Sequence, residues 1–312
     1  MIKTDFPVPD LVALVGHTAG GKTALAAHLA LRLNGEVISA DSRQIYRGMD
    51  IGTGKDLDDY QIGDQLIRYH LINLTEAGKK YSLFDFQQDF WKSYEDIRQR
   101  GKMPIMCGGS GLYAESILKG YSLVQAPVDE AFRKSLEGKP DEELADMLSS
   151  MVPLHNQSDT TERSRLIRAI EVARSGKESE NPGLQSSNPV RPLVHAKVFG
   201  LAFDSETRRQ RITQRLKERL ENGMIDEVKM LLTKVNPEDL IYYGLEYKYL
   251  TQYCIGEISY EQMFASLNTA IHQFAKRQMT WFRGMERRGI PITWIPGELS
   301  LEEKIELVMR KL

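Results

Sequence analysis

Short apolar runs alternate with longer amphipathic segments in the first 120 residues of the chain. Three runs rich in apolar residues predict strands: Leu11 to Val15, Glu36 to Ala40 and Pro104 to Cys107. Two segments with a helical period predict helices: TALAAHLALRL, which stops at Asn34-Gly35, and Phe84 to Arg100, which stops at Gly101. Strands that alternate with helices favour an α/β fold, with a mostly parallel sheet and helices on both of its faces.

The pattern changes from about Tyr121 to Arg191, where strand signals vanish and the sequence is charged and helical. This segment closes with GKESENPGLQSSNPVRP, whose Gly, Pro, Ser and Asn residues are typical of a loop. His195 to Phe203 predicts one more strand, and the chain after Asp204 is mainly helical in pattern. We therefore predict a core domain made of residues 1–120 and 192–312, and a helical insertion subdomain at residues 121–191.

Composition narrows the classes of protein that the chain can be. Its 312 residues carry 41 basic and 43 acidic side chains, so the net charge of −2 gives no sign of a nucleic-acid partner, and any basic surface must be local. The two cysteines, Cys107 and Cys254, form no C-x-x-C pair and fit a reducing cytoplasm better than a disulfide framework or a zinc site. The N-terminal MIKTDFPVPD is a poor match to a signal peptide and no uninterrupted apolar run reaches 18 residues, so we expect no membrane partner.

A complete phosphate-binding motif follows the first predicted strand and precedes the first predicted helix. Its residues match G-x-x-x-x-G-K-S/T, the P-loop: Gly16, His17, Thr18, Ala19, Gly20, Gly21, Lys22 and Thr23. Backbone N–H groups and the helix N-terminus bind phosphate oxygens in such a loop, Lys22 reaches the terminal phosphates, and the Thr23 hydroxyl can ligate Mg²⁺. The motif predicts a bound diphosphate but does not say whose. The GTPase motifs D-x-x-G and N-K-x-D are absent from the sequence, and Asp204, at the end of VFGLAFD, is only a candidate Walker-B aspartate.

Two polar residues follow the next predicted strands. Asp41 comes directly after the second strand and Ser110 follows Gly108-Gly109 after the third. Ligands of open α/β sheets bind beyond the carboxyl ends of the strands. There, Asp41 could accept a proton from an attacking amine, hold Mg²⁺ through water, or cap a turn. Ser110 could approach a ligand or serve as an ordinary turn serine.

Longer segments carry a family resemblance. The P-loop segment GHTAGGKTAL and residues 38–55, ISADSRQIYRGMDIGTGK, closely resemble the tRNA dimethylallyltransferases, also called tRNA isopentenyltransferases. Further matches follow in that family's order: GGSGLY at 108–113, SRLIRAIEV at 164–172, ENGMIDEV at 221–228, GEIS at 256–259 and AKRQMTWFR at 275–283. The sequence differs at some positions, with His17 where the family usually has Pro, Gly20 for Ser, and Ser110 for Thr.

The resemblance implies a P-loop NTPase-like fold, a reaction and a set of site residues. The P-loop would bind dimethylallyl diphosphate, and the N6 amine of adenine 37 in the tRNA anticodon stem-loop would attack it and expel pyrophosphate. Asp41 would be the general base, Ser110 would contact the tRNA near the reacting groups, and Arg215 would hold the diphosphate. The tRNA would also be contacted by two segments of the chain: Asp41, Ser42, Arg43 and Gln44, and Ser164, Arg165, Leu166, Ile167 and Arg168. We expect a cytoplasmic monomer that uses Mg²⁺.

The C-terminal helices carry most of the clustered basic residues. One stripe is formed by Arg208, Arg211, Arg215 and Arg219, which we interpret as a solvated face apart from Arg215. On the last long helix, the spacing predicts that Leu267, Ile271, Phe274 and Trp281 face the core. Off that stripe, Lys276, Arg277 and Arg283, with Arg287 and Arg288, form a basic patch that could bind tRNA phosphates or simply serve solubility.

Three other functions stay open. A related enzyme could prenylate free adenine nucleotides, but such a small acceptor needs neither the insertion nor the basic helices. A P-loop NTPase or small-molecule kinase would release phosphate from ATP. A catalytically silent RNA-binding relative is disfavoured because Lys22, Thr23 and Asp41 are all present.

Overall fold

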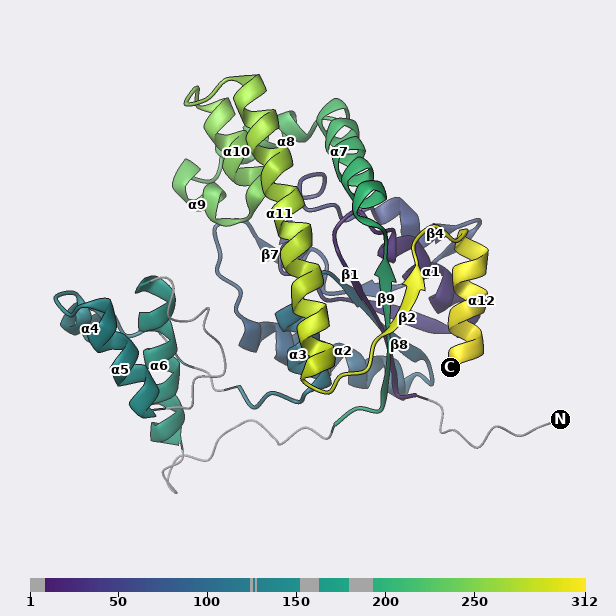
Figure 1. Cartoon of the computed structure of the whole chain (residues 1–312), viewed down its shortest axis with the longest axis horizontal. Helices are drawn as coiled ribbons and strands as arrows, with labels where there is room; N and C mark the ends of the chain where they lie inside the picture. The colour runs from purple at the N-terminus through teal and green to yellow at the C-terminus, as the bar shows by residue number, and fades with distance from the viewer. Residues whose placement is uncertain (1–8, 124–125, 127, 152–162, 180–192) are drawn as a thin grey trace. The chain divides into compact units, whose positions relative to one another are not determined.

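The computed structural model describes residues 9–123, 126, 128–151, 163–179 and 193–312 (Figure 1). Contacts divide the chain into two compact units, one formed by residues up to Gly120 and from Leu193 onward, and the other by Tyr121 to Pro192. None of the helices in the described ranges combines the length and the hydropathy needed to cross a membrane.

The first unit contains a parallel sheet. Within the described residues six strands pair in the order β10-β9-β1-β8-β2-β6, and every pair is parallel. Their bounds are Leu11–Gly16 (β1), Gly35–Ser39 (β2), Tyr69–His70 (β6), Met103–Gly108 (β8), Ala196–Ala202 (β9) and Thr293–Pro296 (β10). The predicted α/β class and parallel sheet are confirmed. The apolar pattern missed β6 and β10, because edge strands of two and four residues are too short to show a period.

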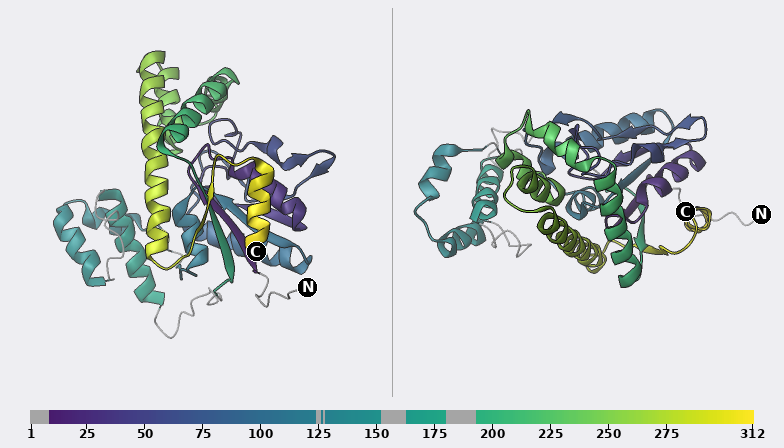
Figure 2. Two further views of the ribbon diagram at one scale, coloured as in Figure 1. Left: turned by 45° about the vertical axis from the view of Figure 1, so that its right-hand side comes forward. Right: turned by 90° about the horizontal axis from the view of Figure 1, so that it is seen from above.

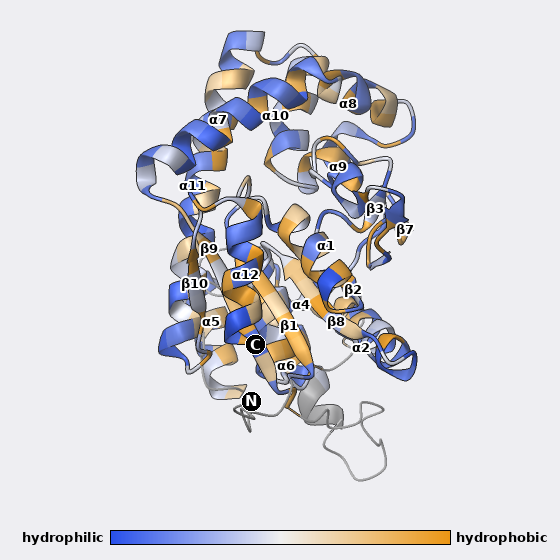
Figure 3. Ribbon diagram, turned by 90° about the vertical axis from the view of Figure 1, so that its right-hand side faces the viewer, coloured by the Kyte–Doolittle hydropathy of each residue, from blue (hydrophilic) through white to orange (hydrophobic). Residues whose placement is uncertain are grey.

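Two apolar layers cover the sheet, and alternate residues of β1 enter each. Ala13 and Val15 join the layer under α2 (Leu83–Gln99), α3 (Gly111–Leu118) and the end of α11 (Tyr260–Arg287). Val12 and Leu14 join the layer under α1 (Lys22–Arg32) and α12 (Leu301–Lys311). Figure 3 shows β1 as hydrophobic along its length, whereas the helices are two-sided. A strand covered on both faces must be apolar at every position, which is why Leu11–Val15 reads as a continuous run.

A helical layer stands beyond the carboxyl ends of the strands (Figures 1 and 2). It consists of α7 (Ser205–Glu221), α8 (Met224–Leu232), α9 (Pro237–Tyr242), α10 (Leu245–Cys254) and the first half of α11. Its core also takes residues from the segment after β2, which contains β3 (Tyr46–Arg47), the 3₁₀ helix η1 (Leu57–Tyr60), β4 (Gln61–Ile62), β5 (Gln65–Leu66) and β7 (Thr75–Glu76). Within this layer α7 lies next to the P-loop, since Arg211 of α7 contacts the Ala19 carbonyl.

The 28-residue helix α11 joins the helical layer to the sheet. Leu267 and Ile271 are buried and Trp281 is partly buried, as predicted. The prediction that Phe274 lies in the core is wrong, since 38% of it is exposed and its ring lies 5.9 Å from the Arg277 guanidinium. The buried stripe passes through Ala275 and Gln278 instead, because α11 turns from one core to the other at this point.

The described residues of the second unit form three helices, α4 (Glu130–Leu136), α5 (Asp141–Met151) and α6 (Arg163–Ser179). Its core includes Leu166, which is fully buried, so the prediction that this side chain contacts tRNA is wrong. The carboxylate residue Glu171, on the same helix, is also buried. Burial works to raise the pKa of the Glu171 carboxyl, but hydrogen bonds from Arg133, Arg168 and the Asp129 amide outweigh it and lower the pKa to about 2.

Candidate active site

The residues singled out after β1, β2 and β8 meet at the carboxyl edge of the sheet. These strands are neighbours in the order β1-β8-β2, so the P-loop, Ser110 and Asp41 leave the sheet side by side. The Ser42 amide donates a hydrogen bond to Ser110 Oγ (3.1 Å), which joins the loops that follow β2 and β8. Gly108 permits this approach, because an added Cβ would lie 2.1 Å from the Ala40 carbonyl oxygen.

The P-loop has the backbone of an anion cradle. Gly16 and Gly21 have positive φ angles of 146° and 75°, and Ala19 adopts the left-handed region at 59°, where a side chain is unfavourable. Helix α1 begins at Lys22, so its first amides point toward the loop. The Lys22 ammonium donates to the His17 carbonyl (2.7 Å), and burial lowers the pKa of Lys22.

His17 contributes backbone rather than charge to this cradle. Its side chain is fully buried against Phe203, with the ring centroids 5.6 Å apart. Burial lowers the pKa of His17 to about 4, so the ring is neutral at pH 7. Its Nδ1 lies 2.6 Å from the Thr18 carbonyl oxygen, and Nε2 has no hydrogen-bond partner in the described structure.

Gln278 of α11 holds the P-loop and the loop after β8 together, a role that the sequence analysis missed. The Thr18 amide donates to Gln278 Oε1 (2.9 Å), and Gln278 Nε2 donates to the Gly109 carbonyl (2.9 Å). Only 7% of Gln278 is exposed. The available signal was an amide side chain on the apolar stripe of a long helix, because a buried amide needs hydrogen-bond partners.

The segment predicted to contact tRNA after β2 is partly occupied by contacts within the protein. Asp41 is half-buried and its Oδ1 accepts the Arg43 amide (2.9 Å). Both ends of the Gln44 amide are used, since Oε1 accepts Ser39 Oγ (2.8 Å) and Nε2 donates to the Gly54 carbonyl (3.0 Å). Gln44 therefore supports the neighbouring backbone. The Arg43 guanidinium lies beside the exposed Tyr242 ring, 5.8 Å from its centroid.

The arginine stripe of α7 faces inward more than its charge pattern predicts. Arg215 and Arg219 both lie against Asp56, and Arg211 Nε donates to the Ala19 carbonyl of the P-loop (3.1 Å). The interpretation of Arg219 as solvated is thus wrong, since only 13% of its side chain is exposed beside Asp56, an acceptor that spacing alone cannot show. Arg211 is exposed, as predicted, although its Nε contacts the P-loop. Burial, and then the charge of Arg219, lower the pKa of Arg215 to about 10, which leaves it a cation at neutral pH.

An open cavity of about 850 Å³ runs along α7 beside the P-loop, with Ala19, Arg211 and Arg215 in its wall. A smaller pocket next to it is lined by Thr18, Arg219 and Glu246 among others. Burial raises the pKa of the Glu246 carboxyl. The cavity wall combines Ala19 of the P-loop motif with four basic side chains and one carboxylate, a mostly cationic lining that suits an anionic ligand: Arg209, Arg211, Arg215, Lys217 and Glu218.

The donor groups also fit Mg²⁺ of the kind that P-loops hold. Thr23 stands in the first turn of α1 and is half-buried. In the described ranges no cluster of three His, Cys, Asp or Glu side chains could hold a metal by itself. Mg²⁺ keeps several waters and takes oxygens from a bound phosphate, so one hydroxyl ligand is compatible with it. The Walker-B candidate Asp204 instead caps α7, where its Oδ1 accepts the Glu206 and Thr207 amides (2.8 and 3.0 Å).

Basic residues of α11 remain exposed on one surface. Lys276, Arg277 and Arg283, all exposed, are named here the α11 basic patch. Arg288 does not belong to it, because it forms a bidentate ion pair with the buried Glu115. In the second unit, Ser164 and Arg165 are exposed, Ile167 packs on the core, and Arg168 pairs with Glu171 (3.0 Å).

Known proteins resemble this chain over nearly its whole length. The family model described as IPP transferase matches residues 44–285. A tRNA dimethylallyltransferase 2 of Bacteroides fragilis is 52% identical over 98% of this chain and 99% of its own length. A tRNA dimethylallyltransferase 1 of Parabacteroides distasonis is 53% identical over 96% and 97%. The crystal structure of a tRNA isopentenylpyrophosphate transferase from Bacillus halodurans is 30% identical, with a TM-score of 0.69 over 96% of this chain and 94% of the other. A Staphylococcus epidermidis tRNA isopentenylpyrophosphate transferase is 28% identical, with a TM-score of 0.67 over 97% and 98%.

Proposed function

Since this chain belongs to the IPP transferase family, we propose that it transfers a dimethylallyl group from dimethylallyl diphosphate to N6 of adenine 37 in the tRNA anticodon stem-loop, releasing pyrophosphate. One observation supports the proposal most: a P-loop lysine, a carboxylate and a serine hydroxyl follow three adjacent strands at one edge of the sheet, where α7 arginines contact the P-loop and Asp56. This arrangement offers cations for a departing diphosphate and a base for an amine.

The cationic half of the site stabilises the leaving group. As the bond between the allylic carbon and the diphosphate oxygen breaks, its electron pair goes to the diphosphate. Lys22, the P-loop amides and Arg215 offset the negative charge that develops there, in a site where burial strengthens each interaction. Thr23 would hold Mg²⁺, which supplies further neutralisation of the diphosphate when bound.

The carboxylate half of the site receives the nucleophile. The adenine N6 forms the new C–N bond, and Asp41 accepts the proton that N6 loses. The Arg43 amide donates to Asp41 Oδ1 within the loop, and the Ser42 amide donates to Ser110 Oγ, which holds the Asp41 loop against the end of β8. A base must leave its stack to reach such a site, which favours a loop of single-stranded RNA as substrate. The α11 basic patch, with Ser164 and Arg165, would contact the tRNA.

The test compares acceptors. The purified protein is incubated with Mg²⁺ and dimethylallyl diphosphate, and with unmodified tRNA, AMP or no acceptor. A separate incubation contains Mg²⁺ and ATP, and its phosphate release is followed. Pyrophosphate release is followed and the nucleosides are analysed by mass. We expect N6-dimethylallyl adenosine only with tRNA, and no phosphate release from ATP. Prenylation of AMP with no reaction on tRNA would favour the nucleotide-modifying enzyme, and ATP hydrolysis without prenyl transfer would favour an NTPase; either result contradicts the proposal.

A further inference from the structure

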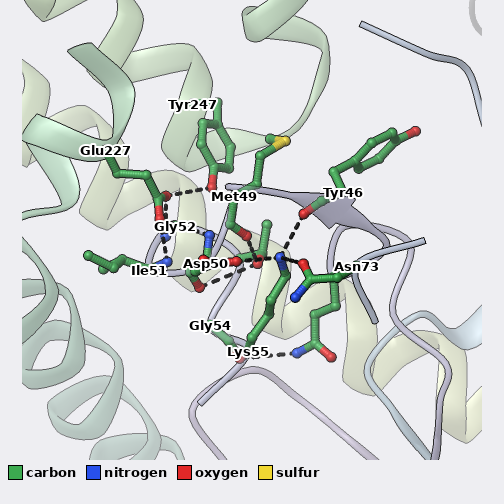
Figure 4. Close-up of polar contacts among 12 residues, drawn as sticks. Tyr46, Met49, Asp50, Ile51, Gly52, Gly54, Lys55, Asn73, Glu227 and Tyr247 are labelled. Atoms are coloured by element: carbon green, nitrogen blue, oxygen red, sulfur yellow. Dashed lines mark hydrogen bonds and ion pairs between the residues drawn. The ribbon is translucent and has the colours of Figure 1, made fainter. Parts of the chain in front are cut away.

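Glu227 of α8 holds three consecutive backbone amides of the segment that follows β3 (Figure 4). Its Oε2 accepts the amides of Asp50 (2.8 Å) and Ile51 (2.7 Å). Its Oε1 accepts the Gly52 amide (3.0 Å) and the hydroxyl of the buried Tyr247 (2.8 Å). Successive amides turned toward one anion form a nest, and here the anion is the protein's own carboxylate.

The same segment, residues 50–56, is fixed a second time by Lys55. This lysine is 1% exposed and donates to the Tyr46 carbonyl (2.6 Å), Asp50 Oδ1 and Asn73 Oδ1. Three acceptors use the full donor capacity of an ammonium group. Lys55 therefore has a structural role. Glu227 holds the start of loop 50–56 through the amides of residues 50–52, and Lys55 holds its end.

Loop 50–56 forms the surface against which the α7 arginines rest. Gly54 has a φ of 64°, and an added Cβ would lie 1.6 Å from Arg219 Nη2 and 2.9 Å from Arg215 Nη2. Asp56, at the end of the loop, lies against both guanidinium groups. Opposite them, Gly52 lies against the Tyr247 ring, where a Cβ would be 2.7 Å from the ring. The position of this backbone thus determines where the two guanidinium groups stand.

We propose that Glu227 is a positioning residue for the diphosphate: by gathering the amides of residues 50–52 it fixes loop 50–56, and through Gly54 and Asp56 it orients Arg215 and Arg219 beside the P-loop. The inference rests on the proposed function and deepens it. A site whose cations are held in place before the ligand arrives binds that ligand without spending free energy on ordering side chains.

Glu227→Gln tests this with little change in size. The carboxylate accepts four hydrogen bonds, whereas an amide offers one acceptor oxygen and turns an NH₂ group toward the remaining donors. We expect the KM for dimethylallyl diphosphate to rise about tenfold or more, while the KM for tRNA stays unchanged. Asp226→Asn is the matched control, because its carboxylate is on the same helix, is exposed and pairs with Lys229; it should leave both KM values unchanged.

Two further measurements separate positioning from general stability. In an Arg215→Ala background Glu227→Gln should raise the KM by a smaller factor than in wild type, because part of its effect acts through that arginine. Tyr247→Phe removes one hydrogen bond from Glu227 and keeps the ring, so it should shift the KM in the same direction in a protein that folds, even if Glu227→Gln does not. Full additivity with Arg215→Ala, or a lower melting temperature with an unchanged KM, would overturn the inference.

Binding of inorganic pyrophosphate, measured by calorimetry, separates this inference from the function it rests on. Wild type that binds pyrophosphate but transfers no prenyl group to tRNA would refute the proposed function alone. In that case weaker pyrophosphate binding by Glu227→Gln and Tyr247→Phe would still support the positioning role, and equal binding would refute it.

Discussion

Gln278 offers the sharpest test of how the two loops that carry the reacting groups are held. Gln278→Met keeps the length of the side chain and removes both of its hydrogen bonds, to Thr18 and Gly109. Gly109 is buried and Thr18 is half-buried, and a buried polar group left unpaired costs about 1–3 kcal/mol. Summed over the two groups, we expect the free energy of unfolding to fall by about 2–6 kcal/mol.

Activity should fall with it, because the Thr18 amide and the loop before Ser110 lose their common support. We expect kcat/KM for prenyl transfer to decrease about tenfold or more, since small misplacements of reacting groups are costly. Urea denaturation and steady-state kinetics measure the two effects. Gln273→Met, at an exposed position of the same helix, is the control and should change neither. If Gln278→Met unfolded at the wild-type urea concentration with wild-type kinetics, the two hydrogen bonds would have no role in holding the site.

The remaining predictions concern chemistry, packing, charge and acid stability. Asp41→Asn should lower the single-turnover rate by about 10² or more at an unchanged melting temperature, and a near-normal rate would refute its role as base. Gly108→Ala places a Cβ 2.1 Å from the Ala40 carbonyl oxygen, so thermal denaturation should show that the free energy of unfolding falls by about 3 kcal/mol. Wild-type stability would mean that the backbone after β2 can move away from the new methyl group at little cost. Neutralising the α11 basic patch should weaken tRNA binding and reduce its log–log salt slope by up to about 2, and an unchanged slope would assign the patch to solubility. Because the folded pKa of Glu171 is about 2, below the ordinary 4.5, its stabilisation of the second unit is complete above pH 4.5 and is lost as the pH falls toward 2. Amide exchange in that unit should show this acid dependence in wild type and not in Glu171→Gln.

The sequence by itself was enough to predict the candidate reacting groups of this protein, because each lies in a short local pattern. The P-loop can be read from thirteen consecutive residues, because strand, glycine turn and helix are each short-range structures. Asp41 and Ser110 could be placed at one edge because parallel strands end on the same side of a sheet. The family followed from longer segments in a fixed order, and the comparisons bear it out.

Only the tertiary structure decided which polar groups meet. Gln278 is 260 residues from Thr18, and Glu227 is 175 to 177 residues from the three amides that it binds. The hydrophobic pattern indicates which side of a helix is buried but not which residues pack against that side. It therefore predicted Arg219 in solvent and Phe274 in the core, and both predictions were wrong. Sequence spacing determines local geometry through the backbone, whereas hydrogen bonds between distant segments depend on how helices pack on the sheet, and that is settled only by the folded chain.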